Sequence, residues 1–232
     1  MKLSVIVPLY NHGRFLPECI RSIFSNQTDL DFEVIIVNDC SIDNSLKVAD
    51  KIAKQSDGRI RVVSTPKNLG LAGARNFGIA ETTSETDFIV CLDSDDMIMK
   101  NYFQQCYKLI EEKNIDISYT DMYLFGAVEK RMNVPEFAKS ILQQSPFIHC
   151  ASMYKRSMWV ELGGYDESIK YCWEDYDFWI RAVVADYKPM KCTSTALLYR
   201  QHVDSITAKV SPKQFEETKR KLRSKLFKFV TF

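Results

Sequence analysis

The stretch Phe88-Ile89-Val90-Cys91-Leu92-Asp93-Ser94-Asp95-Asp96 joins an apolar run to three carboxylates within four positions. The apolar run is typical of a strand buried on both faces of a parallel sheet. Like charges this close repel, and a fold tolerates them where a cation or a donor-rich ligand neutralises them. Hard oxygen ligands favour Mg²⁺ or Mn²⁺, which take further oxygens from a diphosphate. The alternative is an acidic loop that caps the next helix.

Strand and helix patterns alternate along the first half of the chain. They predict strands at residues 3–9, 32–37, 61–64 and 87–92, and helices at 15–24, 43–54, 72–80 and 101–112. This order is typical of an α/β fold with a central, mainly parallel sheet flanked by helices. Ligands of such sheets bind beyond the carboxyl ends of the strands. Residues that follow strand ends should therefore converge on one site: Pro8, Tyr10, Asn11, Asp39, Asp93, Ser94 and Asp95.

The second half of the chain is less regular. Its pattern predicts strands at 117–125, 147–154 and 191–199 and a helix at 175–185. No internal repeat or linker is evident, so we expect one domain over residues 1–207. Its nucleotide-binding half would cover about 1–98 and its acceptor half about 99–207. A basic amphipathic helix would follow at 208–232.

Composition narrows the class of protein. The chain is 46% hydrophobic and 26% charged, as in a globular protein, and its net charge of +1 argues against a nucleic-acid binder. Seven cysteines form no CxxC pair and lie mostly in apolar surroundings, which is typical of free thiols in a reducing compartment. The N-terminus does not resemble a signal peptide, and no apolar run reaches 18 residues. These features predict a cytoplasmic location.

The C-terminal segment carries the main charge asymmetry. Residues 213–232 hold seven Lys or Arg and two Glu, with Leu222, Leu226 and Phe229 at helical spacing. A basic amphipathic helix can lie on an anionic bilayer, so we expect peripheral contact with the inner membrane face. The alternative is a helix packed on the body with a solvated basic face.

Several charged residues have both a structural and a functional interpretation. Arg75, beside Gly70 and Gly73 at a helix start, could face a diphosphate or pair with an acidic loop. Asp43 suits the cap of the following helix. A lone His202 after a strand is usually structural, but could bind a metal or a phosphate. The first strand lacks GxGxxG, which disfavours a dinucleotide-binding dehydrogenase.

The segment Trp173-Glu174-Asp175-Tyr176-Asp177 places two acids on one predicted helix. Asp175 and Asp177 point about 200° apart, so they cannot share one role. Asp177 lies four residues before Arg181, which predicts a surface ion pair. Asp175 shares a face with Trp179, and a carboxylate against aromatic surface has a raised pKa, which suits a general base.

The ordered set of motifs resembles the inverting family-2 glycosyltransferases of GT-A fold, which act in bacterial polysaccharide and cell-surface glycan synthesis. The resemblance extends to about residue 207 and rests on these segments: Ser4 to Asn11, Val37 to Asp43, Asn68 to Asn76, Asp93 to Asp96, Gly163 to Glu167, Glu174-Asp175 and Tyr199 to His202. Each motif is weak, whereas the set in this order is specific.

The resemblance implies transfer of a sugar from a UDP-sugar, or another nucleoside-diphosphate sugar, to a hydroxyl of a glycan or lipid-linked acceptor. Asp175 would be the catalytic base, and Glu174 would orient the acceptor. Asp39 would bind uracil and Asp93 ribose, and Mg²⁺ or Mn²⁺ would bind at Asp95, Asp96 and His202. The implied nucleotide-binding residues are Pro8, Tyr10, Asn11, Asp39, Arg75, Asp93, Ser94 and Asp95. The implied acceptor and sugar pocket comprises Gly163, Gly164, Tyr165, Asp166 and Trp173.

Two other classes of protein remain as alternatives. A sugar-nucleotide binding module without catalysis would be expected to have lost the base or the metal acids, and this chain keeps both. A sugar nucleotidyltransferase usually begins with a Gly-rich basic loop, which Pro8-Leu9-Tyr10-Asn11 lacks. The sequence identifies neither the donor sugar nor the acceptor.

Overall fold

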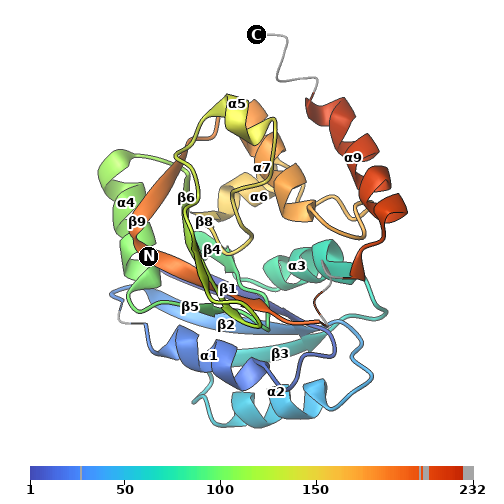
Figure 1. Ribbon diagram of the computed structural model, residues 1–232. Helices are drawn as coiled ribbons and strands as arrows, with labels where there is room; N and C mark the ends of the chain where they lie inside the picture. The colour runs from blue at the N-terminus through green and yellow to red at the C-terminus, as the bar shows by residue number, and fades with distance from the viewer. Residues whose placement is uncertain (27, 204, 206–208, 227–232) are drawn as a thin grey trace.

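A single mixed sheet forms the centre of the computed structural model, which describes residues 1–26, 28–203, 205 and 209–226 (Figure 1). Its strands are β1 (Lys2–Leu9), β2 (Asp31–Asn38), β3 (Ile60–Ser64), β4 (Phe88–Cys91), β5 (Met97–Ile98), β6 (Ile117–Gly126), β7 (Lys130–Met132), β8 (Met153–Lys155) and β9 (Pro189–Gln201). Their order is β3-β2-β1-β4-β8-β6-β9-β5, and β7 pairs with β6. The expected α/β class with a less regular second half is confirmed.

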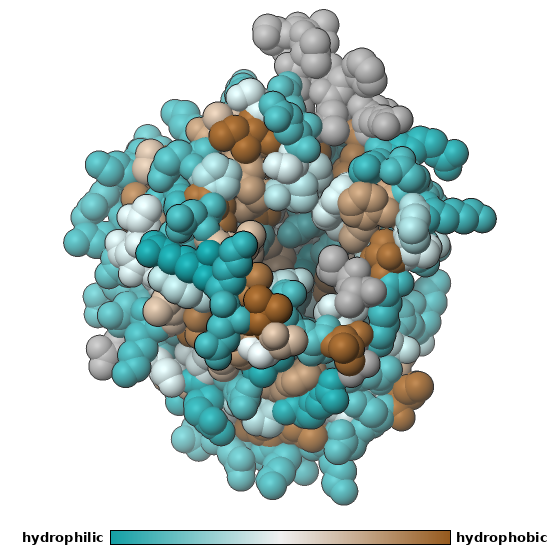
Figure 2. All heavy atoms as spheres, viewed as in Figure 1, coloured by the Kyte–Doolittle hydropathy of each residue, from teal (hydrophilic) through white to brown (hydrophobic). Residues whose placement is uncertain are grey.

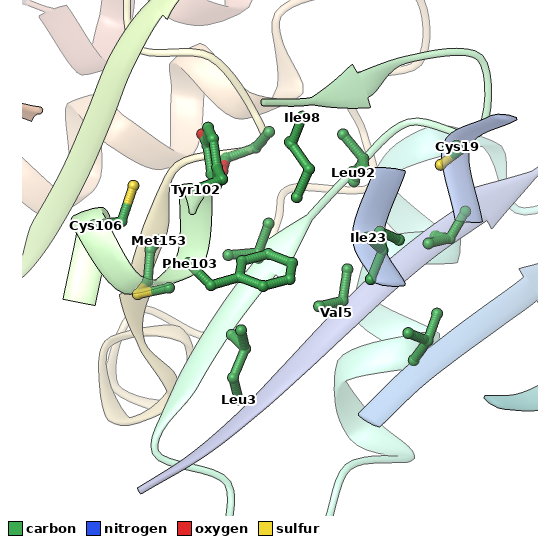
Figure 3. Packing of buried hydrophobic residues seen from close by; sticks show 14 of the residues in the cluster. Leu3, Val5, Cys19, Ile23, Leu92, Ile98, Tyr102, Phe103, Cys106 and Met153 are labelled. Carbon is green, nitrogen blue, oxygen red and sulfur yellow. The ribbon is translucent and has the colours of Figure 1, made fainter. Parts of the chain in front are cut away.

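Helices cover both faces of this sheet. They are α1 (Leu16–Phe24), α2 (Ser45–Lys54), α3 (Gly70–Ala80), α4 (Tyr102–Lys113), α5 (Lys139–Leu142), α6 (Arg156–Glu161), α7 (Glu174–Val184) and α9 (Pro212–Leu226). The apolar residues of α1, α2 and α4 share one core, and those of α3, α6 and α7 share the other. Figure 3 shows part of the first core, where side chains from β1, α1 and α4 meet.

The parallel half of the sheet sets the position of the candidate site. β1 pairs in parallel with β2 and β4, and β2 pairs in parallel with β3. Along β1, Leu3, Val5 and Val7 enter one core while Ile6 enters the other. Both faces are buried, which explains the continuous apolar run in the sequence. The carboxyl ends of β1, β2 and β4 therefore lie along one edge.

The antiparallel half brings the end of β9 to the same edge. The two-residue β5 directly follows the acidic cluster and pairs with Leu197 and Leu198 of β9. β9 itself runs parallel to β6. This pairing places Arg200 and His202 beside Asp95, although more than 100 residues separate them in the chain.

The strand predicted at 147–154 is wrong over most of its length. Only its end belongs to a strand, β8, while residues 147–152 form a loop. Ser152 donates both its backbone N–H and its hydroxyl to the His149 carbonyl, which closes a tight turn. That turn prevents the ladder from extending upstream of Met153.

The C-terminal helix α9 packs against the body, as the second interpretation of the basic segment predicts. Phe215 lies against Trp173 with ring centroids 4.4 Å apart, and Leu222 is buried. Lys228 and Phe229, part of the expected amphipathic pattern, lie outside the described residues. In the part of the chain that the structure describes, no helix combines the length and apolar character needed to cross a bilayer.

Candidate functional site

The loop after β1 is fixed on both sides of His12. Asn11 adopts a left-handed conformation, and its side-chain oxygen accepts a hydrogen bond from the Ile42 N–H at 2.8 Å. The Gly13 N–H donates to Ser45 Oγ at 2.7 Å. A Cβ on Gly13 would lie 2.8 Å from the Ser45 Cα, so only glycine permits this close approach. The β1 loop and the start of α2 are thereby locked together.

Asp39 anchors the start of α3. Its buried carboxylate accepts hydrogen bonds from the Thr65 hydroxyl at 2.7 Å and from the N–H groups of Leu69 and Gly70 at 2.8 and 2.9 Å. These are orphan donors of a helix N-terminus, which also favours a negative charge. Asp39 therefore caps α3, a helix that begins 31 residues later in the chain. Asp43, expected to cap α2, accepts a hydrogen bond from the Ser45 N–H.

Arg75 lies at the centre of a buried ionic network. Its guanidinium donates to Asp93 Oδ1 at 2.8 Å and to a carboxylate oxygen of Glu174. Its side chain is 1% exposed, against 22% for Asp93 and 8% for Glu174. Burial alone would lower the pKa of Arg75, but the nearby carboxylates raise it above its ordinary value. Of the two interpretations of Arg75, the structure supports pairing with acidic groups, and it joins the end of β4 to the start of α7.

Asp175 lies next to this network at the first turn of α7. Burial, followed by the charge of Glu174, raises the pKa of Asp175 to about 7, although Arg75 lowers it. One carboxylate oxygen accepts a hydrogen bond from the Tyr176 N–H at 2.8 Å. The pKa of Asp175 is raised in the expected direction, through burial and the charge of Glu174, so its carboxylate can exchange a proton near neutral pH.

Asp95 faces two histidines on the other side of the acidic cluster. Its Oδ2 lies 2.8 Å from His202 Nε2 and 3.7 Å from His12 Nδ1. Candidate ligand atoms of these three side chains all lie within 4.8 Å of one another, and all three residues are half-buried. Asp95 and His202 were predicted from the sequence as metal ligands, whereas His12, three residues after the end of β1, was not.

Asp96 does not belong to this group. It is 1% exposed, and one of its oxygens accepts a hydrogen bond from the Arg200 N–H at 2.8 Å. Burial, then the charges of Asp95 and Asp93, raises the pKa of Asp96 well above its ordinary value. The Arg200 side chain is also engaged, because it donates to the Asp95 carbonyl at 2.7 Å and pairs with Glu18. Asp96 thus connects the acidic cluster to β9.

The expected acceptor pocket is only partly brought together. Gly163 and Gly164 line an open groove of about 490 Å³ with Asn76, Trp159 and other residues of α3 and α6. Tyr165 is buried, and its hydroxyl lies near Cys91 and Tyr154. Asp166 pairs with Lys225 at 2.7 Å, and Trp173 packs against Phe215. Asp166 contacts α9 and lines, with Gly163, Gly164 and Tyr165, a second open pocket of about 460 Å³. Trp173 also contacts α9 and lines neither pocket.

The ion pair between Asp177 and Arg181 is confirmed at 2.8 Å, but its predicted place at the surface is wrong. Asp177 is 0% exposed. Lys225 of α9 also pairs with Asp177 and covers that side of α7. The ion pair was predicted from the four-residue spacing of Asp177 and Arg181. The burial of Asp177 was not, because the helix that covers it, α9, comes from a distant part of the chain.

The remaining predicted residues differ in exposure. Tyr10 is 43% exposed, whereas Pro8 and Ser94 are buried. Cys150, which carries no motif in the sequence, lies with its Sγ 3.6 Å from Asp93 Oδ2. All seven cysteines are free, as expected. The face of the molecule seen in Figure 2 is hollowed near its centre, where polar and apolar residues meet.

Comparison with known proteins identifies the class to which this fold belongs. The family model described as "Glycosyl transferase family 2" matches residues 4–165, and "Glycosyltransferase like family 2" matches residues 117–225. The chain therefore belongs to glycosyl transferase family 2. The structure of S. aureus TarS 1–349 in complex with UDP-GlcNAc superimposes with a TM-score of 0.80 at 23% identity, covering 97% of this chain and 66% of that chain. The fold is accordingly GT-A.

Two curated relatives support the same family, and a further solved structure shares the fold. Glycosyltransferase GlyG of Streptococcus pneumoniae is 37% identical over 121 residues, which cover 52% of this chain and 39% of GlyG. Hyaluronan synthase of Pasteurella multocida is 30% identical over 184 residues, covering 77% of this chain and 18% of the synthase. A structure of GalNAc-T7 with UDP, GalNAc and Mn²⁺ has a TM-score of 0.75 at 15% identity, covering 96% of this chain and 48% of that chain. The chain thus spans well under half the length of the two curated relatives, GlyG and the hyaluronan synthase.

Proposed function

We propose that this protein is a metal-dependent inverting glycosyltransferase that moves a sugar from a UDP-sugar to an acceptor hydroxyl. One observation carries the proposal: Asp175, with a pKa near 7, adjoins the chain Glu174–Arg75–Asp93 that leads to the acidic cluster after β4. A carboxylate that can accept a proton near neutral pH suits base-assisted transfer. The acidic cluster beside it could hold a divalent cation and, through that cation, a diphosphate donor.

The proposed donor site follows the ends of β1, β2 and β4. Similar structures contain UDP or UDP-GlcNAc, which supports a UDP-sugar. The exposed ring of Tyr10 suits stacking on the base. Asp39 already receives three hydrogen bonds, and a carboxylate has about four acceptor sites, so one direction stays free for uracil. Asp93, 22% exposed, is the proposed ribose contact.

The proposed cation site is Asp95 with His202. A half-buried carboxylate oxygen 2.8 Å from an imidazole nitrogen fits a divalent ion that also takes diphosphate oxygens. A bound Mn²⁺ or Mg²⁺ would stabilise charge on the leaving diphosphate. GalNAc-T7 was solved with Mn²⁺, which supports the same class of cofactor here. Asp96, whose carboxylate faces the Arg200 backbone, is left out of the proposed ligand set.

The reaction proposed for this geometry is a single displacement. Asp175 removes the proton of the acceptor hydroxyl as that oxygen attacks the anomeric carbon and the bond to the diphosphate breaks. One displacement inverts the anomeric centre. Glu174, paired with Arg75, keeps the start of α7 in place, and its negative charge adds to the effect of burial in raising the pKa of Asp175. Proton acceptance by Asp175 is therefore tuned by its immediate neighbour.

The proposed acceptor is a glycan or a lipid-linked saccharide. The groove beside Gly163 and Gly164 is the proposed acceptor-side surface. We also propose that outward-facing cations of α9, such as Lys213 and Arg220, contact an anionic membrane surface. Cosedimentation with vesicles tests this contact.

The decisive experiment separates donor binding from transfer. Calorimetric titration with UDP-GlcNAc, in Mn²⁺ and in EDTA, measures binding, and UDP release with a panel of saccharide acceptors measures transfer. Asp175→Asn should bind the donor like wild type and lose at least about 100-fold in transfer, the usual contribution of a general base. Asp50→Asn, on the exposed side of α2, is the matched control and should change neither.

Other outcomes would overturn the proposal. Normal transfer by Asp175→Asn excludes that residue as the base. Donor binding without UDP release by the wild type, across the acceptor panel, favours a silent binding module. Release of pyrophosphate in place of UDP indicates a nucleotidyltransferase.

A further inference from the structure

We propose that His12 is a third protein ligand of the cation, so that the site binds a transition metal such as Mn²⁺ before any nucleotide arrives and discriminates against Mg²⁺. This inference rests on the proposed function and adds to it a residue, a metal preference and an order of binding. His12 belongs to the β1 loop, a part of the chain separate from Asp95 and from His202.

The distances suit one ion. Neighbouring ligands of an octahedral ion with bonds near 2.1 Å lie about 3 Å apart, and opposite ligands lie about 4.2 Å apart. Asp95 Oδ2 lies 2.8 Å from His202 Nε2 and 3.7 Å from His12 Nδ1. All three ligand atoms lie within 4.8 Å of one another, so side-chain rotation that shortens the longer separations would bring them onto one ion and leave its other positions for diphosphate oxygens and water.

The backbone around His12 is held from both sides. The hydrogen bonds of Asn11 with Ile42 and of Gly13 with Ser45 flank it directly. The Asn11 N–H also donates to Ser41 Oγ at 3.1 Å. An ordinary exposed histidine needs no such support, whereas a ligand benefits from it because less conformational freedom is lost on binding.

The imidazole rings are oriented by packing against a phenylalanine. The ring of Phe15 lies 5.7 Å from that of His12 and 4.7 Å from that of His202, and the two imidazoles contact each other edge to face at 5.5 Å. Ring contacts fix both side chains while their nitrogen atoms remain able to bind a cation. On the His202 ring, Nε2 contacts Asp95, whereas Nδ1 has no hydrogen-bond partner among the described residues.

The donor set decides which metal is favoured. Mg²⁺ strongly prefers oxygen ligands and usually relies on substrate phosphates, whereas imidazole nitrogen suits transition metals. A site with only Asp95 and His202 would need the diphosphate to hold its ion. With His12, the protein itself supplies two nitrogens and one oxygen, so Mn²⁺ can bind without nucleotide.

Titration of the full chain with Mn²⁺ alone tests the inference. Electron paramagnetic resonance of free Mn²⁺ gives the Kd without nucleotide, and Mg²⁺ competition gives the selectivity. His12→Ala should raise the Kd for Mn²⁺ about tenfold or more, at least the effect of removing an outer-sphere partner. Mg²⁺ binding should change little, so the Mn²⁺ preference falls. Asp50→Asn is the control, and urea unfolding verifies that each variant is folded.

A different role for His12 predicts the opposite change in the affinity for Mn²⁺. If His12 is only an ion-pair partner of Asp95, its removal frees the carboxylate, and Mn²⁺ binds His12→Ala as tightly as wild type or more tightly. That result overturns the inference. The same titration with UDP present separates it from the proposed function. If, with UDP present, Asp95→Ala and His202→Ala lose Mn²⁺ binding while His12→Ala does not, only the inference about His12 fails. If none of the three variants changes Mn²⁺ binding, the proposed cation site fails as well.

Discussion

Replacing Arg75 by methionine would test the buried network on which the candidate site depends. Methionine keeps much of the side-chain volume but removes the cation that separates Asp93 from Glu174. Both carboxylates would then face a poorly hydrated interior without a counter-charge. The variant should therefore lose folding free energy mainly through electrostatics, with packing as a smaller contribution.

The expected loss follows from burial. Removing one partner of a buried ion pair costs about 3–5 kcal/mol, because the remaining charge stays uncompensated. Water can reach Asp93, at 22% exposure, more easily than Glu174, at 8%, so a value in the lower half of that range is expected. For a chain of this size, each 1 kcal/mol corresponds to roughly 2–4 °C in Tm. Arg61, 42% exposed and 3.4 Å from Glu33, gives a matched control. Arg61→Met should cost at most about 1 kcal/mol.

Urea unfolding at pH 8, followed by circular dichroism and tryptophan fluorescence, measures both losses and tests whether unfolding is two-state. The double variant Arg75→Met/Glu174→Gln should recover a substantial part of the loss, because only one buried charge then remains. A loss below about 1 kcal/mol for Arg75→Met, similar to the control, would refute the reasoning. A full loss without recovery in the double variant would show that packing, not charge, is the cause.

Two further predictions concern pH and membranes. Because Asp175 has a pKa of about 7 and acts in its ionised form, kcat/KM should rise about tenfold per pH unit below pH 7 and level off above it. A plateau that extends down to pH 5 would mean that another group is the base. In cosedimentation, wild type should bind vesicles containing anionic lipid and not neutral ones, and Lys213→Glu/Arg220→Glu should bind less. Equal recovery with both vesicle types would contradict the proposed membrane contact.

The parallel half of the fold could be predicted because its signals are local. β1, β2 and β4 are buried on both faces, so each is an uninterrupted apolar run in the sequence, and α1, between β1 and β2, shows helical spacing. The edge where their carboxyl ends meet was predicted from topology alone. That edge does contain Asp39, Asp93 and Asp95.

Contacts between distant segments account for what could not be predicted. β5 contains two residues and exists through its pairing with β9, about 100 residues away, so nothing in its own sequence identifies it. The same pairing brings His202 to Asp95. Asp39 shows the same difficulty in a different form, because its position after β2 gave no sign that it caps α3, a helix that begins 31 residues later.

His12 was visible in the sequence but lacked a distinguishing pattern. A single histidine in a loop is usually structural, and its spacing to Asp95 carries no motif. What identifies it is the approach of three separate chain segments, which the aromatic ring of Phe15 helps to hold. Listing every metal-ligating residue type at each strand end would have included it.

The two ion pairs that Lys225 forms with Asp166 and Asp177 have a consequence for how the chain folds during its synthesis. Synthesis proceeds from the N-terminus, so Asp177 leaves the ribosome 48 residues ahead of Lys225, and before then only Arg181, of the described residues that pair with it, is at hand. Until α9 docks, the ring of Trp173 lacks the cover of Phe215, and apolar surface exposed in this way favours association between incomplete chains. The sheet can assemble early, while the Asp177 side of α7 is covered only when α9 docks.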